Sequence, residues 1–253
     1  MIESVDVGSG ELSVYFVEDV KSRTSHKQAD RIALIFYGAP SAPHYDGVDS
    51  DLFLESFATR LASSANGLVG VVQLRGVGAS DGVFSPLGWT QDVQGICEYL
   101  CNKNPGARVF LIGFELASIA CLAAATELDQ VAGVATISIV ASIPPYNLDC
   151  VDLSSQLANL GVRVPKDLLE IKKWQEEFEA IDPILIAPRL GSTPWLVIHG
   201  TNDRGVTEDA VRILLDEVAG FGELHMVNAG ADSLRADPRV LALLSGWIAR
   251  IDT

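Results

Sequence analysis

Glu115 is the acidic side chain that the sequence places best for chemistry. An apolar run, Val109 to Ile112, leads directly into the segment Gly113–Ala117, and a stretch rich in Ala and Ser follows. This order predicts a buried strand, a sharp turn and a helix that packs closely against its sheet. If an apolar cap covered the cleft at this turn, the carboxylate would have a raised pKa, which suits proton transfer near neutral pH.

Three further side chains are candidates to assist this carboxylate. Tyr37 ends the apolar run that starts at Ile32, and His44 and Tyr45 follow a few residues later. A continuous apolar run of this length is typical of a central strand covered on both faces, so these residues are expected near one end of that strand. The other histidines lie in a polar loop, at the end of a predicted strand and inside a predicted strand (His26, His199 and His225).

The elements that would position these groups alternate along the chain. After an N-terminal β-hairpin (5–7 and 12–17), apolar runs that predict strands are followed by segments that predict helices. Such alternation indicates an α/β fold with a mostly parallel central sheet, right-handed crossovers and helices on both faces. The predicted strands are 32–37, 68–74, 109–112, 131–140, 195–199 and 223–227, and the main helices are 51–64, 90–102 with Thr90 as its cap, 208–218 and 238–251.

One segment, 142–190, interrupts this alternation. It opens with Pro144 and Pro145 and continues through a polar stretch into a helix expected from about residue 164. The segment is too small to hold a core of its own, so the chain is predicted to be a single domain, 1–253, with a cap insertion at about 142–190. Four apolar residues of the helix, spaced by threes and fours, form a stripe that either roofs a cleft above Glu115 or packs on the edge of the sheet (Leu168, Ile171, Trp174 and Phe178).

The composition excludes several classes of protein. The 253 residues carry 33 acidic and 18 basic side chains, a net charge of −15, and such a chain is repelled by nucleic acids and by anionic membranes. With 48% apolar residues the chain can bury one large core, but no apolar run is long enough to span a bilayer. The N-terminus lacks the pattern of a secretion signal. We therefore expect a cytoplasmic protein with neither a nucleic-acid partner nor a membrane partner.

The four cysteines do not form a recognisable metal or disulfide pattern. Cys97 and Cys101 share a helix face at i, i+4, but no histidine or further cysteine lies near them in the sequence. Isolated cysteines of this kind behave as small apolar residues in a reducing compartment. No metal and no other cofactor is therefore predicted.

Five short motifs, each at the end of a predicted strand, resemble those of the α/β-hydrolase family. They span nearly the whole chain and occur in the order in which the family has them. The resemblance implies an α/β-hydrolase fold, although a fold alone does not establish function. The motifs are Tyr37–Pro40, Arg75–Ser80, Gly113–Ala117, His199–Asp203 and Asn228–Ser233, which are similar to H-G-x-P, R-G-x-G-x-S, G-x-S-x-G, H-G-x-x-D and x-x-G-A-D-H.

The resemblance assigns roles to five of these residues. It places Glu115 at the nucleophile, Asp203 at the acid and Ser233 at the histidine of the family's triad, and it implies an oxyanion hole made by the backbone N–H groups of Ala39 and Leu116. In the family a serine attacks an acyl carbon, a histidine takes its proton and an acid orients the histidine. Two of these three residue types differ here, and loss of triad members lowers the rate by orders of magnitude. A conventional serine esterase is therefore not expected.

Two hypotheses of different classes follow. The first is a pseudo-hydrolase, a hydrolase-like protein with a degenerate catalytic triad that binds a small ligand or a protein partner. The second is an active hydrolase or lyase in which Glu115 acts as acid/base or as nucleophile. Because a carboxylate is a poor nucleophile toward esters and no histidine is placed to release a covalent intermediate, we favour the first. In either case the pocket candidates are Tyr37, His44, Tyr45, Trp174 and Phe178.

The orientation of the Glu115 side chain distinguishes two arrangements of this site. Atom for atom the side chain copies an acyl-enzyme, so one carboxylate oxygen would accept hydrogen bonds from the N–H groups of Leu116 and Ala39, at the start of the helix. The oxyanion hole would then be filled by the protein's own side chain. In the alternative, Glu115 swings outward to a cation or to water and leaves the hole to a ligand's anion, an arrangement that would favour an active site. We expect the first arrangement.

Overall fold

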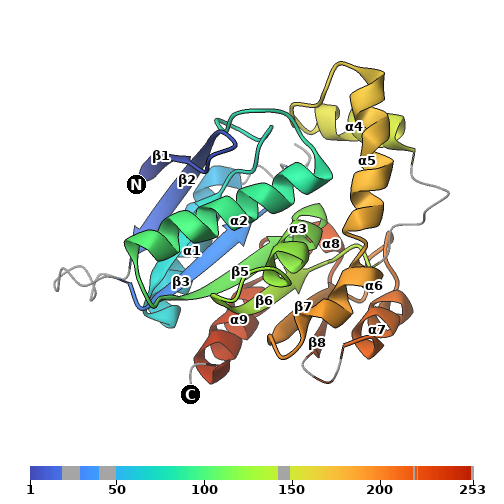
Figure 1. Cartoon of the computed structure of the whole chain (residues 1–253). Coiled ribbons are helices and arrows are strands. Elements are labelled where there is room, and N and C mark those ends of the chain that lie inside the picture. Colours follow the sequence, from blue (N-terminus) through green and yellow to red (C-terminus); the bar gives the residue numbers. More distant parts are fainter. Residues whose placement is uncertain (19–28, 40–49, 142–148, 219, 221, 252–253) are drawn as a thin grey trace.

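The computed structural model describes residues 1–18, 29–39, 50–141, 149–218, 220 and 222–251. Within this part of the chain, eight strands form one mixed sheet in the order β1-β2-β4-β3-β5-β6-β7-β8 (Figure 1). β2 pairs antiparallel with both β1 and β4, and every pairing from β4 to β8 is parallel. The strands are β1 (Ile2–Asp6), β2 (Glu11–Glu18), β3 (Arg31–Phe36), β4 (Leu68–Val72), β5 (Arg108–Phe114), β6 (Val131–Ile137), β7 (Trp195–Gly200) and β8 (Gly222–Val227).

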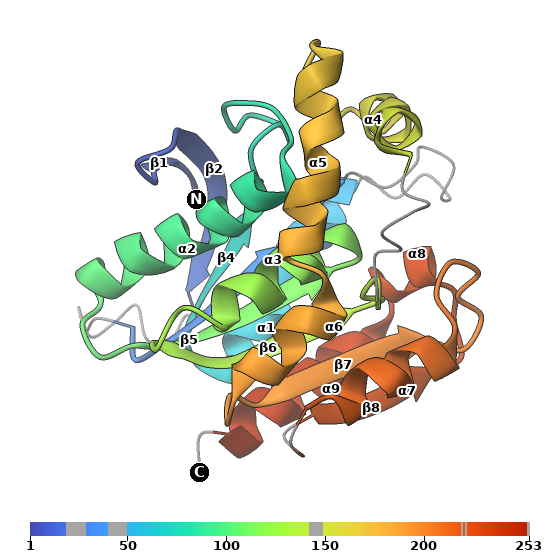
Figure 2. The ribbon, with the colours of Figure 1, turned by 45° about the vertical axis from the view of Figure 1, so that its right-hand side comes forward.

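Helices cover both faces of the sheet, as the alternation in the sequence predicts (Figures 1 and 2). One face packs against α1 (Ser50–Ala65) and α9 (Pro238–Ile251), which also contact each other. The other face packs against α2 (Pro86–Lys103), α3 (Leu116–Ala125) and α7 (Glu208–Asp216). Because β3 and β5 lie between these two layers, almost every residue of both strands is buried, which explains their unbroken apolar sequence.

The helix that follows β4 begins earlier than the sequence analysis placed it. Its N-cap is Ser85, whose side chain accepts a hydrogen bond from the Gly88 N–H, and Pro86 occupies the first turn. Thr90, the predicted cap, is buried inside the helix. The true signal was a Ser followed directly by Pro, because a serine side chain caps the helix and a proline needs no N–H partner in its first turn.

Between β6 and β7 the chain forms a group of helices. α4 (Cys150–Asn159) and α5 (Leu168–Ala180) contact each other, and α5 also contacts α2; Figure 2 shows both near the end of α2, beside the sheet. α6 (Pro183–Ile186) and the 3-10 helix η2 (Ala187–Leu190) lead back to the sheet. α4 was not predicted, because half of its residues are polar and its apolar residues form no unbroken run; Asp149 caps it by accepting from the N–H groups of Val151 and Asp152.

The apolar stripe predicted on α5 is correct for three of its four residues. Ile171, Trp174 and Phe178 are buried, but Leu168 is 56% exposed and its neighbour Leu169 is 68% exposed. Both exposed residues belong to the first turn of the helix, so this turn extends beyond the core that covers the later turns. The prediction for Leu168 is therefore wrong.

Candidate functional site

Glu115 lies at the sharp turn between β5 and α3, as the sequence predicts. Its backbone angles are φ 48° and ψ −119°, and a positive φ is uncommon and strained for a residue with a side chain. The turn is held by the Glu115 N–H, which donates to the Ile137 carbonyl at 2.8 Å, and by the Glu115 carbonyl, which accepts from Ser118 at 3.1 Å. Gly113 permits the close approach of α3, because a Cβ there would lie 2.6 Å from the Ser118 Cα.

The carboxylate of Glu115 is bound by Arg235. The Arg235 Nε donates to Oε1 and Nη2 donates to Oε2, both at 2.9 Å, while Nη1 donates to the Ala39 carbonyl at 2.9 Å. Two parallel charge-assisted hydrogen bonds are the strongest arrangement that a guanidinium and a carboxylate make. Arg235 directly follows α8 (Ala231–Leu234), the short helix after β8. One guanidinium thus joins the loops at the ends of β3, β5 and β8.

This contact decides between the two arrangements of Glu115, and the arrangement expected from the sequence is wrong. Both carboxylate oxygens accept from Arg235, and in the described part of the chain neither Leu116 nor Ala39 donates to them. A bidentate cation binds a carboxylate more strongly than two neutral N–H groups. Sequence reasoning missed Arg235, although it lies only two residues beyond Ser233 and the alternative arrangement named a cation or water as the partner of Glu115.

The other two predicted triad positions do not form a hydrogen-bonded group with Glu115. The Asp203 Oδ1 accepts from the N–H groups of Gly205 and Val206 at 2.8 Å and 3.0 Å, so this side chain stabilises its own loop. Ser233 lies in α8, where its N–H donates to the Gly230 carbonyl at 3.1 Å. Within the residues described, no hydrogen bond connects the side chains of Glu115, Asp203 and Ser233.

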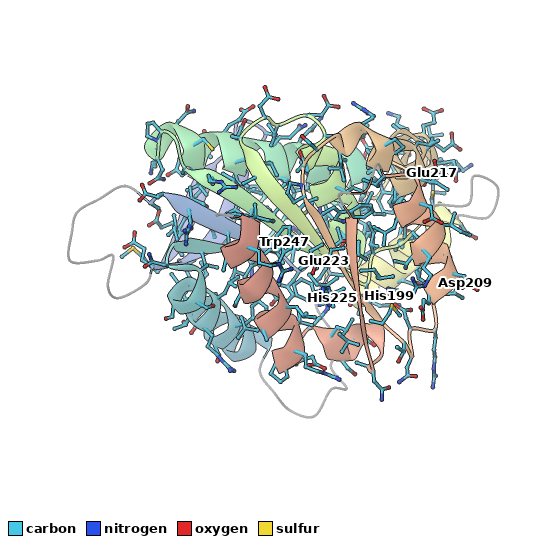
Figure 3. The ribbon with its side chains drawn as sticks, turned by 90° about the horizontal axis from the view of Figure 1, so that it is seen from below. His199, Asp209, Glu217, Glu223, His225 and Trp247 are labelled. Atoms are coloured by element: carbon cyan, nitrogen blue, oxygen red, sulfur yellow. The ribbon has the colours of Figure 1, made fainter. Side chains whose placement is uncertain are left out.

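His199 and His225 have structural contacts on neighbouring strands, β7 and β8 (Figure 3). His199 is buried, with Nε2 2.9 Å from the Val206 carbonyl and 3.8 Å from the Asp203 Oδ2. His225 Nε2 lies 2.5 Å from the Glu223 Oε1. Partial burial of Glu223 opposes its ionisation, but the hydrogen bonds from His225 and Arg250 lower its pKa overall. His225 therefore belongs to an ionic cluster on the edge strand.

Two buried hydroxyl groups lie at the ends of β3 and β6, the strands that flank β5. The Tyr37 ring stacks on Phe114 with centroids 4.4 Å apart, and its hydroxyl has no hydrogen-bond partner in the described structure. Burial raises the pKa of Tyr37 far above its ordinary value, although the nearby charge of Arg235 acts in the opposite direction. Ser138, with a strained φ of 51°, likewise has an unpartnered buried hydroxyl. Of the remaining pocket candidates, His44 and Tyr45 lie outside the described residues.

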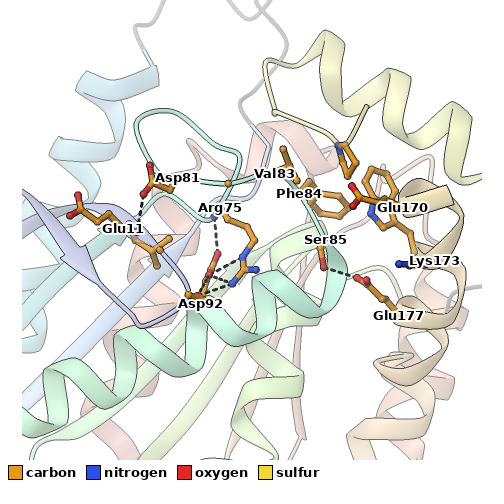
Figure 4. A pocket seen from close by; sticks show the side chains of 16 residues that line it. Glu11, Arg75, Asp81, Val83, Phe84, Ser85, Asp92, Glu170, Lys173 and Glu177 are labelled. Atoms are coloured by element: carbon orange, nitrogen blue, oxygen red, sulfur yellow. Dashed lines mark hydrogen bonds and ion pairs between the residues drawn. The ribbon is translucent and has the colours of Figure 1, made fainter. Parts of the chain in front are cut away.

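The aromatic residues of the cap pack on the loop before α2. The rings of Trp174 and Phe178 lie 4.7 Å and 6.4 Å from the ring of Phe84. Beside Trp174 there is a cavity of about 360 Å³ between α5, this loop and the β1–β2 turn (Figure 4). Neither Glu115 nor Arg235 belongs to its wall. These rings therefore pack on the loop before α2, which is neither of the two places that the sequence analysis offered, a roof over Glu115 or the edge of the sheet.

The motif at 75–80 also serves to position the chain. The Arg75 backbone N–H and its guanidinium bind the buried carboxylate of Asp92 at distances of 2.7–3.0 Å (Figure 4). This ion pair fixes the β4–α2 loop to α2.

Among the described residues, no group of three or more His, Cys, Asp or Glu side chains is placed to hold a metal ion. No helix in the same part of the chain is long and apolar enough to cross a membrane.

Comparison with known proteins gives matches in structure only. No model of a known protein family matches the chain, and no curated protein matches it in sequence. Est1E from Butyrivibrio proteoclasticus, solved with bound ferulic acid, is similar with a TM-score of 0.68 at 14% identity, over 97% of this chain and 96% of that one. An α/β serine hydrolase homologue from Coxiella burnetii has a TM-score of 0.60 at 15% identity, over 99% and 96% of the two chains.

A third structure, E-2-(acetamidomethylene)succinate hydrolase, has a TM-score of 0.68 at 16% identity, over 98% of this chain and 99% of that chain. The chain has the α/β-hydrolase fold. At these identities the similarity shows the fold alone. In open sheets of parallel strands, binding sites form beyond the carboxyl ends of the strands. In this α/β-hydrolase fold the Glu115–Arg235 pair lies there, at the end of the central strand β5.

Proposed function

We propose that this chain is a pseudo-hydrolase, an α/β-hydrolase-like protein that has lost serine-hydrolase activity and binds a small ligand or a protein partner. The observation that carries the proposal is the bidentate contact between Arg235 and Glu115. Acyl transfer by this fold needs a nucleophile, a base that takes its proton and an acid that orients the base. At the nucleophile position the chain has Glu115 in place of a serine, and the side chain that contacts it is a guanidinium and not a histidine base.

Each member of the pair is poorly suited to ester hydrolysis. A guanidinium stays protonated at physiological pH, so Arg235 does not act as a general base. Attack by a carboxylate on an ester gives an anhydride, and a second residue must then activate water to release it. Asp203, the predicted acid, uses one of its oxygens to hold the loop after β7. These contacts favour binding over catalysis.

The alternative, an active hydrolase or lyase that uses Glu115, requires a neighbour that exchanges protons with it. The described part of the chain offers the Tyr37 hydroxyl in this region, but burial raises its pKa, which argues against a role as base, and no hydrogen bond joins it to Glu115. No contact among the described residues therefore favours this second function.

Assays of the purified protein separate the two functions. Wild-type protein and Glu115→Gln are compared in hydrolysis of p-nitrophenyl acetate and in labelling by a fluorophosphonate probe. We expect no burst, no labelling and equal background rates in both proteins. Hydrolysis that depends on Glu115, or a labelled serine in the wild-type protein, would contradict the proposed loss of activity.

A further inference from the structure

The exposure of the Glu115–Arg235 pair is unequal. The Arg235 side chain is 10% exposed, whereas the Glu115 side chain is 31% exposed. Solvent therefore reaches the Glu115 side chain more than the Arg235 side chain.

Arg235 is held in position by a contact that does not involve Glu115. Its Nη1 donates to the Ala39 carbonyl at 2.9 Å, while Nε and Nη2 form the planar edge that binds the carboxylate. Glu115 is thus an intramolecular ligand on a preoriented guanidinium, and its geometry shows which chemistry that edge accepts. A planar carboxylate matches it, because its two oxygens take two parallel N–H groups.

The start of α3 offers a second binding position for the Glu115 carboxylate. The backbone N–H groups of Leu116 and Ala39 do not bind Glu115 in this structure, and Leu116 begins α3, a helix of ten residues. A carboxylate at the N-terminus of a helix is stabilised by the unpaired N–H groups and the helix dipole. Leu116 directly follows Glu115 in the chain, and Ala39 lies in the loop that Arg235 joins to Glu115, so we take these two N–H groups as the second position of the carboxylate.

The Tyr37 hydroxyl is a second polar group of this region. It is buried, has no hydrogen-bond partner in the described structure, and the charge of Arg235 acts on its pKa against the larger effect of burial. A buried hydroxyl without a partner is costly, and a ligand group that accepted its hydrogen bond would remove this cost.

We propose that the ligand of this site is a small carboxylic acid, which replaces Glu115 on Arg235 while the Glu115 carboxylate turns to the N–H groups of Leu116 and Ala39. The proposal rests on the proposed binding function and names the ligand class. After the exchange Arg235 is paired with the carboxylate of the ligand, and the Glu115 carboxylate accepts from the two N–H groups, so neither the guanidinium nor Glu115 is left without a partner. Glu115 then competes with the ligand for Arg235, and this competition lowers the affinity of the protein for the ligand.

If the ligand replaces Glu115 on Arg235, removing the Glu115 charge raises the affinity for the ligand. If the ligand bound to Glu115 itself, the same change would lower the affinity. Because Glu115 is tethered next to Arg235, its effective concentration is high and a free carboxylate competes poorly. Glu115→Gln removes the competing charge and keeps the side-chain volume, so this variant is expected to bind benzoate at least about tenfold more tightly than wild type. A ligand that contacts Glu115 itself would lose affinity in the same variant.

The measurement is a calorimetric titration with benzoate, benzamide and benzylamine. The matched control is Glu223→Gln, which removes the same charge from another glutamate bound to an arginine, Arg250. We expect benzoate affinity to rise in Glu115→Gln, to stay at the wild-type value in Glu223→Gln, and to be lost when Arg235→Gln is added to Glu115→Gln. Benzamide and benzylamine are expected to show no gain.

Two results would overturn the proposal: benzoate affinity no higher in Glu115→Gln than in Glu223→Gln, or benzylamine binding that disappears in Glu115→Gln. Thermal melts check folding, and where Arg235→Gln does not fold, Arg235→Lys serves, because lysine keeps the charge but cannot form the planar contact. Ester hydrolysis that depends on Glu115 would contradict the proposed function separately, since the titrations report only exchange on Arg235.

Discussion

At the scale of single residues, the site is governed by charge pairing between positions far apart in the chain. Glu115 and Arg235 are separated by 120 residues, and one guanidinium serves both the carboxylate and the Ala39 carbonyl. Breaking a buried pair by removing one partner costs about 3–5 kcal/mol where both are buried, and less here because Glu115 is partly exposed. The pair therefore helps to fix three loops as well as the strained backbone at Glu115.

Tyr37 allows a test at the same scale. Replacing Tyr37 by Phe removes a buried hydroxyl without a partner and keeps the ring that stacks on Phe114. We expect the free energy of unfolding to rise by about 1 kcal/mol, measured by urea denaturation at pH 7. The Tyr99→Phe variant is the control, because the Tyr99 hydroxyl is bound by Lys103 on the surface of α2. A loss of stability in Tyr37→Phe would show that the hydroxyl has a bound partner.

The pH dependence of the same variant has a definite sign. Burial raises the pKa of Tyr37 in the folded protein, while the unfolded chain releases this proton near pH 10. The folded state is thus favoured below the unfolded pKa, and this advantage falls as the pH rises above about 10. Tyr37→Phe is expected to lose stability less steeply than wild type in this range, measured by urea denaturation at a series of pH values; equal slopes in both proteins would contradict the prediction.

At the scale of elements, sequence periodicity predicts what depends on local burial. The strands β3, β5 and β7 and the helix α9 were found within one or two residues of their bounds, because each is covered along its length and shows an apolar run or stripe. The helix α4 was missed because half of its residues are polar and its apolar residues form no unbroken run. Arg235 was missed for a different reason: only the packed fold brings it to Glu115, and no local pattern marks that contact.

The cap is attached to the β4–α2 loop by polar contacts that the sequence does not reveal. The Arg163 guanidinium donates to the carbonyls of Gly78, Ser80 and Gly82, and the Arg163 backbone bonds Gly76 and Phe84. A second polar contact joins α5 to the same region: the Ser85 hydroxyl, at the start of α2, donates to the carboxylate of Glu177 (Figure 4). These bonds hold α4 and α5 against the rest of the molecule.

Removing this attachment should loosen the cap alone. Arg163→Ala deletes three side-chain hydrogen bonds but leaves the sheet and its core intact, so local opening of α4 and α5 becomes easier. We expect faster hydrogen exchange at residues 150–180 and unchanged exchange in β5 and β6, measured by mass spectrometry. Lys172→Ala, which removes an exposed cation from α5, is the control. Uniform acceleration across the sheet would show instead that Arg163 stabilises the whole fold.

At the scale of the whole molecule, the motifs gather at the carboxyl ends of the parallel strands. Ala39 follows β3, Glu115 follows β5, Asp203 follows β7, and Ser233 and Arg235 follow β8. Any triad chemistry therefore depends on three loops from different parts of the chain. In this molecule, Arg235 joins the loop after β8 to the loop after β5, whereas Asp203 accepts hydrogen bonds within its own loop after β7.

Rebuilding a triad tests whether the assigned positions are equivalent to those of active members of the fold. The double change Glu115→Ser and Ser233→His leaves Arg235 buried without its carboxylate, and its guanidinium lies beside the new serine. Adding Arg235→Met removes that charge and fills the volume. Because triad members act as a unit, we expect hydrolysis of p-nitrophenyl acetate and fluorophosphonate labelling from the triple variant only, at least about tenfold above wild type.

The decisive controls for the rebuilt triad each lack one member. The variant with Glu115→Ser and Arg235→Met contains the serine without the histidine, and the one with Ser233→His and Arg235→Met contains the histidine without the serine. Asp203→Asn in the triple variant removes the acid, which should lower the rate because a histidine needs an acid to fix its tautomer and orientation. Equal rates with and without Ser233→His would mean that residue 233 does not stand where this fold keeps its base, and that the position must be sought elsewhere along the loop after β8.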